Sequence, residues 1–292
     1  MNAIEIINLT KSYGKNRGIE NIDLTVEEGD FFGFIGPNGA GKSTTIRTLL
    51  GLISKTDGSA KIFGEEVGPG KKEILSKIGY LPSETDFYQG MRVKDVLKFS
   101  AELHKKNCDT EARYLCEKLD LDVSRKVDEL SLGNRKKVGI VCALQHKPSL
   151  YIMDEPTSGL DPLMQKAFYE LMNERNKEGA TVFLSSHVLS EIQNNCRHAA
   201  VIREGKILAC DTVENLGTGG AKKIILSGIE SVPQISGIKG IKALDDGVLF
   251  YYSGDMQKLL KTLSLLSFKD ITISEPDLNE IFLHYYETEG EK

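Results

Sequence analysis

The residues best suited to chemistry in this 292-residue chain lie in the stretch GPNGAGKST at positions 36–44. Its spacing fits GxxxxGK[ST], in which glycines let successive backbone N–H groups curl around an anion and a helix start adds partial positive charge. An apolar run at 31–35 precedes it and a helix-like pattern at 44–53 follows, a context that a chance glycine turn lacks. The sequence therefore predicts a polyphosphate cradle. Its residues are Gly36, Pro37, Asn38, Gly39, Ala40, Gly41, Lys42, Ser43 and Thr44.

Two side chains of this loop have distinct predicted roles. Lys42 is expected to reach the outer phosphates, and the hydroxyl of Ser43 is expected to enter the coordination shell of Mg²⁺.

A second candidate lies where the apolar run 150–153 ends in two adjacent carboxylates, Asp154 and Glu155. A buried strand has no packing use for acids at its carboxyl end, and open α/β sheets bind ligands in the crevice there. We expect Asp154 to support Mg²⁺, usually through water, and Glu155 to act as general base or to position water at the γ-phosphate. A solvated strand end that carries acids is the alternative, which the upstream phosphate loop disfavours.

A histidine completes this candidate edge. The predicted strand 181–185 delivers Ser186 and His187 at its end, on the same sheet edge as Asp154 and the phosphate loop. A lone histidine is more often structural than catalytic, but three polar strand ends that converge on one edge favour a functional role.

A further anion site is indicated at LSLGN, residues 130–134, which opens a helix over 135–146. Ser131 and the N–H groups of that helix start present a favourable dipole. The site lies within a helical insertion, far from the phosphate loop of its own chain, so it serves a second molecule or nothing. An ordinary helix cap followed by the solvated basic run 135–137 is the alternative that these residues alone favour.

The elements that must position these groups follow from the hydrophobic pattern. Residues 1–30 alternate as antiparallel strands, about 84–148 turn helical, and strand and helix signals then alternate to about residue 209. We expect an α/β fold with its boundary near the loose glycine-rich run at 217–220. Residues 1–216 then form one domain, and residues 217–292 form a small α+β unit that ends in a helix over 276–287.

Composition limits the class of protein. The chain is 40% hydrophobic and 27% charged, with a net charge of −5 and a pI of about 5.7, so a nucleic-acid partner has no bulk electrostatic support. Its longest apolar runs fall far short of the ~20 residues that cross a bilayer. With no leader pattern at the start we expect a cytoplasmic protein, whose five cysteines are reduced, mostly packed thiols.

In this order and spacing the motifs resemble those of the ATP-binding subunit of ABC transporters. Residues 36–44 match the Walker A motif, 151–155 the Walker B motif with its catalytic glutamate, 130–134 the signature, 158–161 the D-loop and His187 the switch histidine. The resemblance covers about residues 1–216. It implies a P-loop ABC cassette with a mixed sheet, an antiparallel β subdomain and a helical insertion.

The resemblance also implies cofactors and roles. ATP and Mg²⁺ would bind, with Lys42, Glu155 and His187 as catalytic residues and Tyr13 stacked on adenine; taken alone, Tyr13 is more often a half-buried strand residue. In a head-to-tail homodimer or heterodimer, the opposite ATP would be contacted by the signature and the D-loop. The residues concerned are Ser131, Gly133, Asn134 and Asp161.

Two departures from the family pattern stand out. Leu132 and Asn134 occupy positions that are usually glycine and glutamine, and Leu132 cannot adopt a positive φ without strain. Ser83 and Glu84 stand where the family usually has a glutamine that senses Mg²⁺, so Glu84 is a candidate replacement ligand or the contact is absent.

The last part of the chain, around residues 275–282, looks like the extension of ATPases that serve ABC-2-type exporters of drugs and peptide antibiotics. This implies a separate membrane permease, with the chain held at the inner membrane face through it. We expect the permease to dock on residues 87–91 and the start of the next helix. An equal alternative is that Phe87 and Tyr88 fill a small core. A nucleotide-binding regulator in a heterodimer, with weak or no hydrolysis, is the alternative function.

Overall fold

The computed structural model divides into two compact units, Met1–Cys210 and Asp211–Lys292. It describes all residues except 15, 69, 219–221, 230–231, 234 and 275–292. The division falls at residue 211, whereas the sequence placed the boundary at 217, because the short helix α8 (Val213–Thr218) groups with the second unit.

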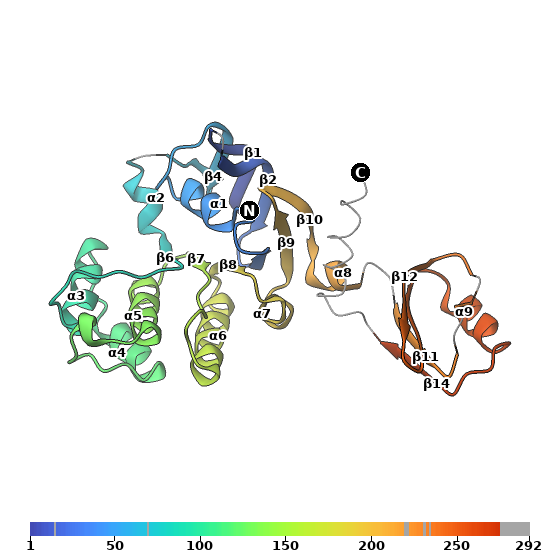
Figure 1. The fold of residues 1–292 in the computed structure, drawn as a ribbon. Helices are drawn as coiled ribbons and strands as arrows, with labels where there is room; N and C mark the ends of the chain where they lie inside the picture. Colours follow the sequence, from blue (N-terminus) through green and yellow to red (C-terminus); the bar gives the residue numbers. More distant parts are fainter. Residues whose placement is uncertain (15, 69, 219–221, 230–231, 234, 275–292) are drawn as a thin grey trace. The chain divides into compact units, whose positions relative to one another are not determined.

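A six-stranded sheet in the order β10-β9-β3-β8-β7-β6 is the centre of the first unit (Figure 1). Five of these strands, β9, β3, β8, β7 and β6, run parallel to one another, so their carboxyl ends meet at one edge. The strand bounds are β3 Phe31–Ile35, β6 Ile78–Leu81, β7 Leu150–Asp154, β8 Thr181–Ser186, β9 His198–Arg203 and β10 Lys206–Thr212.

An antiparallel sheet packs over one face of this core, in the order β2-β1-β4-β5. Its strands are β1 (Asn2–Tyr13), β2 (Asn16–Glu27), β4 (Asp57–Ile62) and β5 (Glu65–Glu66). Helix α1 (Lys42–Leu49) contributes Ile46 and Leu49 to the apolar cluster that joins the two sheets. Within that cluster the rings of Phe32 and Phe183 stack with centroids 5.9 Å apart. This burial holds the strand that precedes the phosphate loop rigid.

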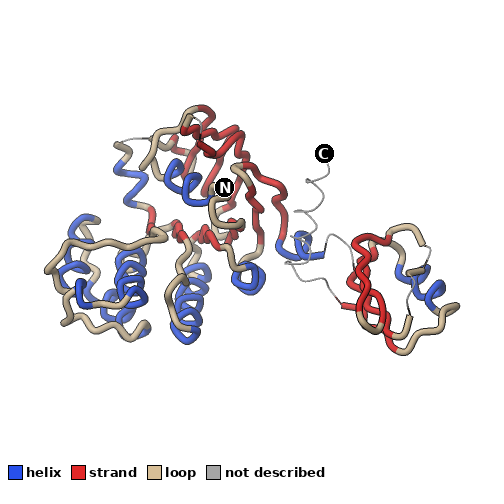
Figure 2. The backbone as a smooth tube through the Cα atoms, in the orientation of Figure 1, coloured by secondary structure: helices blue, strands red, loops and turns tan. Residues whose placement is uncertain are grey.

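Helices cover the opposite face (Figure 2). Helices α6 (Pro162–Lys177) and α7 (Leu189–Asn195) contact β8, and α5 (Leu132–Leu144) contacts β6. Helix α6 begins after Asp161, whose carboxylate accepts hydrogen bonds from the N–H groups of Leu163 and Met164, with Pro162 at its first position. The cap fixes where the polar turn after β7 ends.

The helical insertion consists of α3 (Val93–Leu103), α4 (Asp109–Lys118), the short 3₁₀ helix η1 (Val127–Glu129) and α5. A five-residue helix, α2 (Lys72–Ser76), precedes β6. At the carboxyl end of α5 the imidazole of His146 is 3.1 Å from the carbonyl oxygen of Ile78 and stacks on His104 at 3.7 Å. This contact anchors the far end of α5 to the start of β6.

The second unit contains a four-stranded sheet in the order β12-β13-β11-β14, with antiparallel pairs. Its strands are β11 (Lys222–Ser227), β12 (Ile238–Leu244), β13 (Gly247–Tyr252) and β14 (Asp270–Ser274). Helix α9 (Met256–Leu263) buries Leu259 and Leu263 against Phe250 and its neighbours. The helix predicted over 276–287 lies outside the described residues.

The predicted α/β class with a mixed sheet, an antiparallel subdomain and a helical insertion is confirmed for the first unit. Strand β5 and helix α2 were not predicted, because they are only two and five residues long. Strand β12 was also not predicted. Over the part of the chain that the structure describes, none of the helices has the length and apolarity needed to span a membrane.

Candidate nucleotide site

The phosphate loop leaves the buried strand β3 and ends at helix α1, as the sequence predicts. A side chain on Gly36 would place its Cβ 2.2 Å from the carbonyl oxygen of Ile202 in β9, so only glycine fits that approach. Gly41, just before α1, has a φ of +111°, which side-chain-bearing residues rarely adopt. The loop between them is anchored by the N–H of Gly205, which donates to the carbonyl of Ala40 at 2.9 Å.

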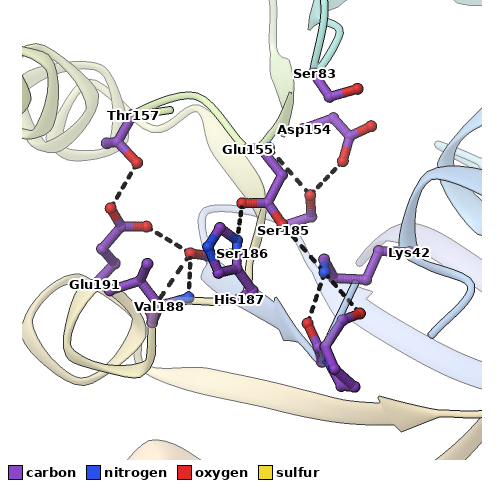
Figure 3. A network of polar contacts seen from close by, with 12 residues as sticks. Lys42, Ser83, Asp154, Glu155, Thr157, Ser185, Ser186, His187, Val188 and Glu191 are labelled. Atoms are coloured by element: carbon purple, nitrogen blue, oxygen red, sulfur yellow. Dashed lines mark hydrogen bonds and ion pairs between the residues drawn. The ribbon is translucent and has the colours of Figure 1, made fainter. Parts of the chain in front are cut away.

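Lys42 folds back over this loop. Its ammonium donates to the carbonyl oxygens of Gly36, at 2.6 Å, and Pro37, at 3.2 Å, and lies 3.1 Å from Oε1 of Glu155 (Figure 3). Lys42 is only 5% exposed, so the charge is poorly hydrated and depends on these partners. An incoming phosphate would replace them with stronger anionic oxygens. Ser43 and Thr44, which follow, are half-buried in the first turn of α1.

Asp154 at the end of β7 is fully buried. Its Oδ1 accepts a hydrogen bond from the hydroxyl of Ser185 at 2.5 Å, and β7 and β8 pair these two residues in register. Its Oδ2 has no hydrogen-bond partner among the described residues. A buried carboxylate oxygen without a partner is costly unless a cation binds there, so this carboxylate and the Ser43 hydroxyl fit the oxygen ligands that Mg²⁺ prefers.

Glu155 lies between the phosphate loop and β8. Its Oε2 is 2.7 Å from Nδ1 of His187, so the predicted acid and the predicted histidine are in direct contact (Figure 3). The backbone of Glu155 has a φ of +49°, in the left-handed region. Such a conformation in a residue other than glycine costs on the order of 1–2 kcal/mol.

The predicted second anion site is a separate cavity. Ser131 caps α5 by accepting a hydrogen bond from the N–H of Asn134 at 3.3 Å. An open cavity of about 730 Å³ is lined by the signature and by the turn before α6, including Ser131, Gly133, Asn134, Gly159 and Asp161. Its lining, as far as the structure describes it, includes no residue of the phosphate loop. A Cβ on Gly133 would meet the carbonyl oxygen of Gly159 at 2.6 Å, so signature and D-loop pack closely.

The strain expected at Leu132 does not arise. Leu132 begins α5 and is not among the residues with positive φ, so its position in the signature requires no glycine. Its side chain is 59% exposed and lies over Gly159. Tyr13, the predicted adenine platform, is 45% exposed at the end of β1, with the ammonium of Lys11 5.1 Å from its ring centre.

The segment after β6 places Glu84 at the surface and exposes it to solvent. The carbonyl oxygens of Pro82 and Ser83 accept hydrogen bonds from Lys136 of α5, at 3.2 and 2.7 Å. Burial lowers the pKa of Lys136 to about 8, against the opposing attraction of Asp154, Glu155 and Glu84. Lys136 therefore ties the first turn of α5 to the strand end beside the carboxylates.

Three candidate functional residues were not predicted from the sequence: Ser185, Lys136 and Glu191. The position of Ser185 opposite Asp154 requires the strand register, and Lys136 appeared to belong to a solvated basic run although it is 2% exposed. Glu191 accepts hydrogen bonds from Thr157 and Ser186, both at 2.5 Å (Figure 3). Its two partners lie 34 and 5 positions away in the sequence, so no local pattern pointed to this residue.

The predicted docking segment carries exposed apolar side chains. Tyr88 is 74% exposed, which excludes it from a small core, and its ring meets that of Phe99 on α3 edge-on at 6.3 Å. Leu103, one helical turn beyond Phe99, is 68% exposed. Phe87 is half-buried. Tyr88, Phe99 and Leu103, which we call the α3 patch, form an apolar surface on the helical insertion.

Comparisons with known proteins agree with this geometry. A family model described as "ABC transporter" matches residues 19–158. The bacitracin transport ATP-binding protein BcrA of Bacillus licheniformis is 36% identical and covers 96% of each chain. The linearmycin resistance ATP-binding protein LnrL of Bacillus subtilis is 28% identical over 95% of this chain and 96% of that protein. A solved ATP-binding subunit of an ABC transporter superposes with a TM-score of 0.70 at 30% identity, covering 73% of this chain and 91% of that one.

Proposed function

Because this chain belongs to the ATP-binding proteins of ABC transporters, we propose that it binds and hydrolyses ATP to drive a separate membrane permease, through closure of a dimer. The observation that carries the proposal is the division of the polar groups between two places. Lys42, Asp154, Glu155 and His187 gather at one sheet edge, while Ser131 lines a separate open cavity.

In this proposal the triphosphate is held on one side by the loop N–H groups and by Lys42. Binding exchanges the present partners of Lys42, two loop carbonyls and Glu155, for phosphate oxygens. Glu155 is thereby released to accept a proton from, or to orient, the attacking water, and His187 holds the carboxylate in place at 2.7 Å. Mg²⁺, held by Ser43 and Asp154, would neutralise phosphate charge.

The other side of each nucleotide comes from a second chain. Ser131 and the first N–H groups of α5 form the kind of helix start that binds anions, and the cavity in front of them is open. In the proposed dimer Gly133, Asn134 and Asp161 complete that surface. ATP binding would then join two chains, and hydrolysis would remove the bridge.

For the permease we propose an ABC-2-type exporter, supported by two relatives that are named for bacitracin transport and linearmycin resistance. The α3 patch is the proposed docking surface, because exposed aromatic and aliphatic side chains grouped on α3 and the loop before it favour a protein partner. In this arrangement the chain works on the cytoplasmic face of the membrane, and residues 217–292 serve as an accessory domain.

The experiment is ATP turnover by the purified chain as a function of protein concentration. The proposal predicts that activity per molecule rises as dimers form and is lost in Glu155→Gln. A chain that binds ATP but is inactive at every concentration would favour the regulator in a heterodimer.

A second experiment addresses the permease. Co-expression with an ABC-2-type permease is expected to yield a complex that Leu103→Glu weakens. The matched control is Leu52→Glu, which changes another exposed leucine of the same unit, 57% exposed. Equal loss of complex in both variants would contradict docking at the α3 patch.

A further inference from the structure

Glu191 is the acceptor at the centre of a polar network next to the proposed active centre (Figure 3). The hydroxyl of Thr157 donates to its Oε1 and the hydroxyl of Ser186 to its Oε2, each at 2.5 Å. Thr157 is 5% exposed and Ser186 is fully buried, so water does not compete freely for these bonds. Hydrogen bonds of this length to a carboxylate are among the stronger ones in proteins.

The two donors belong to the segments that carry the reacting groups. Thr157 lies two residues after Glu155, and Ser186 lies directly before His187. The hydroxyl of Ser186 also accepts a hydrogen bond from the N–H of Val188 at 2.9 Å, which closes a tight turn around His187. One side chain of α7 therefore holds both ends of the Glu155–His187 contact.

The same network reaches the signature cavity. Thr157 begins the turn that continues through Gly159 to the helix cap Asp161, and both of these residues line the cavity. The N–H of Leu160 donates to the carbonyl of Thr157 at 3.0 Å, so the turn is internally bonded. Thr157 and the D-loop are therefore joined by a short, internally bonded turn.

We propose that Glu191 is a positioning residue that sets the Glu155–His187 contact and couples it to the D-loop through Thr157 and Ser186. This inference rests on the proposed ATPase function. Glu191 touches neither nucleotide nor water in this scheme and acts only through the two segments that it holds. Loss of its carboxylate should therefore lower turnover without weakening ATP binding.

The test is a double-mutant cycle of Glu191→Ala with His187→Ala, followed by kcat and by ATP affinity. In the wild-type background we expect Glu191→Ala to lower kcat about tenfold and to change ATP affinity less than about twofold. In a chain that already carries His187→Ala, we expect Glu191→Ala to cause little further loss of kcat. Glu191→Gln, which retains one acceptor and the side-chain shape, should recover part of kcat.

Equal loss of kcat in both backgrounds, or a loss of ATP affinity in place of kcat, would overturn the inference. If Glu191→Ala does not fold, Thr157→Val tests the same link, since it removes one donor and keeps the side-chain shape. Failure of the proposed function is distinguishable: there the wild type itself would not hydrolyse ATP, whereas here the wild type is active and Glu191→Ala is equally active.

Discussion

The two polar surfaces of the first unit differ in how their groups are satisfied. At the carboxyl edge of the parallel strands, Lys42, Glu155 and His187 are already paired with one another. At the signature, Ser131 uses its hydroxyl only as a cap for Asn134 and faces an open cavity. The groups of the first surface are paired with one another within one chain, whereas the second surface combines a helix dipole with an open cavity. The lining of that cavity includes both acidic and basic residues: Asp120, Asp122, Asp161, Arg125 and Lys137. This difference is the basis of our proposal that each chain supplies two unlike halves of a shared site.

The largest expected effect concerns the first surface, where Lys42, Glu155 and His187 are paired with one another. Glu155→Gln keeps the side-chain shape but removes the base and the partner of Lys42, so we expect kcat to fall about a thousandfold. ATP should remain bound and trap a dimer, seen as a doubled mass by light scattering in Mg-ATP. Glu170→Gln, the same substitution at a carboxylate that is 64% exposed on α6, is the control for general damage. A variant that turns over normally would remove Glu155 from the chemistry.

The next largest effect concerns the second surface, where Ser131 faces the open cavity at the signature. Ser131→Asp retains the cap of α5 but places a negative charge where a phosphate should bind, so we expect turnover to fall about a hundredfold. The Kd of ATP for the monomeric variant, measured by calorimetry at low protein concentration, should stay within about twofold of the wild-type value. Ser131→Thr, which keeps the hydroxyl, is the matched control. Loss of ATP binding by the separate chain would place Ser131 in the same half-site as Lys42.

A smaller effect concerns the base of the nucleotide. Tyr13→Ala should weaken ATP binding about tenfold, because stacking of a base on an aromatic ring contributes about 1–3 kcal/mol. Tyr13→Phe keeps the ring and should bind as the wild type does. Because Tyr13 is 45% exposed and packs little, folding should be unchanged. Equal affinity of all three proteins would show that the adenine lies elsewhere.

The smallest effect concerns how stability depends on pH through His146, which anchors the end of α5 to β6. Burial, and then the neighbouring His104, lower the pKa of His146 to about 4 from an ordinary value of 6.5. Between these values the unfolded chain binds more protons than the folded one, so stability falls as pH decreases from 6.5 toward 4. We expect a loss of about 2 kcal/mol from pH 7 to pH 5 from this group.

Urea unfolding of the wild type and of His146→Gln at pH 7 and pH 5 measures this contribution. The variant should show a smaller loss between the two pH values than the wild type does. Identical pH dependence in His146→Gln and the wild type would show that His146 does not govern acid sensitivity.

Sequence reasoning was strongest where a backbone requirement and a chemical requirement coincide. The phosphate loop needs glycine at Gly36 and Gly41 and an ammonium at Lys42, so residue type alone reveals it. Glu155 and His187 were recognised separately, but their 2.7 Å contact depends on β7 and β8 being neighbours in the sheet.

The remaining contacts depend on tertiary structure. Lys136 resembled a solvated charge in the sequence, yet its ammonium is buried beneath the carbonyls of Pro82 and Ser83. Glu191 joins residues 34 and 5 positions away, which no local pattern encodes. Whether Leu132 would need a positive φ could not be told from residue type, and in the structure the first turn of α5 does not require one.

The central claim, that two chains complete each other's nucleotide sites, is tested most directly by disulfide formation between two differently tagged chains. One chain carries Asn38→Cys at the exposed tip of the phosphate loop, the other carries Ser131→Cys, and both carry Cys210→Ser to remove the exposed native thiol. The account predicts a crosslink between the two tags in Mg-ATP and little without nucleotide. Absence of that crosslink in chains that bind ATP, or a disulfide formed only within one chain when both cysteines are placed together, would contradict it.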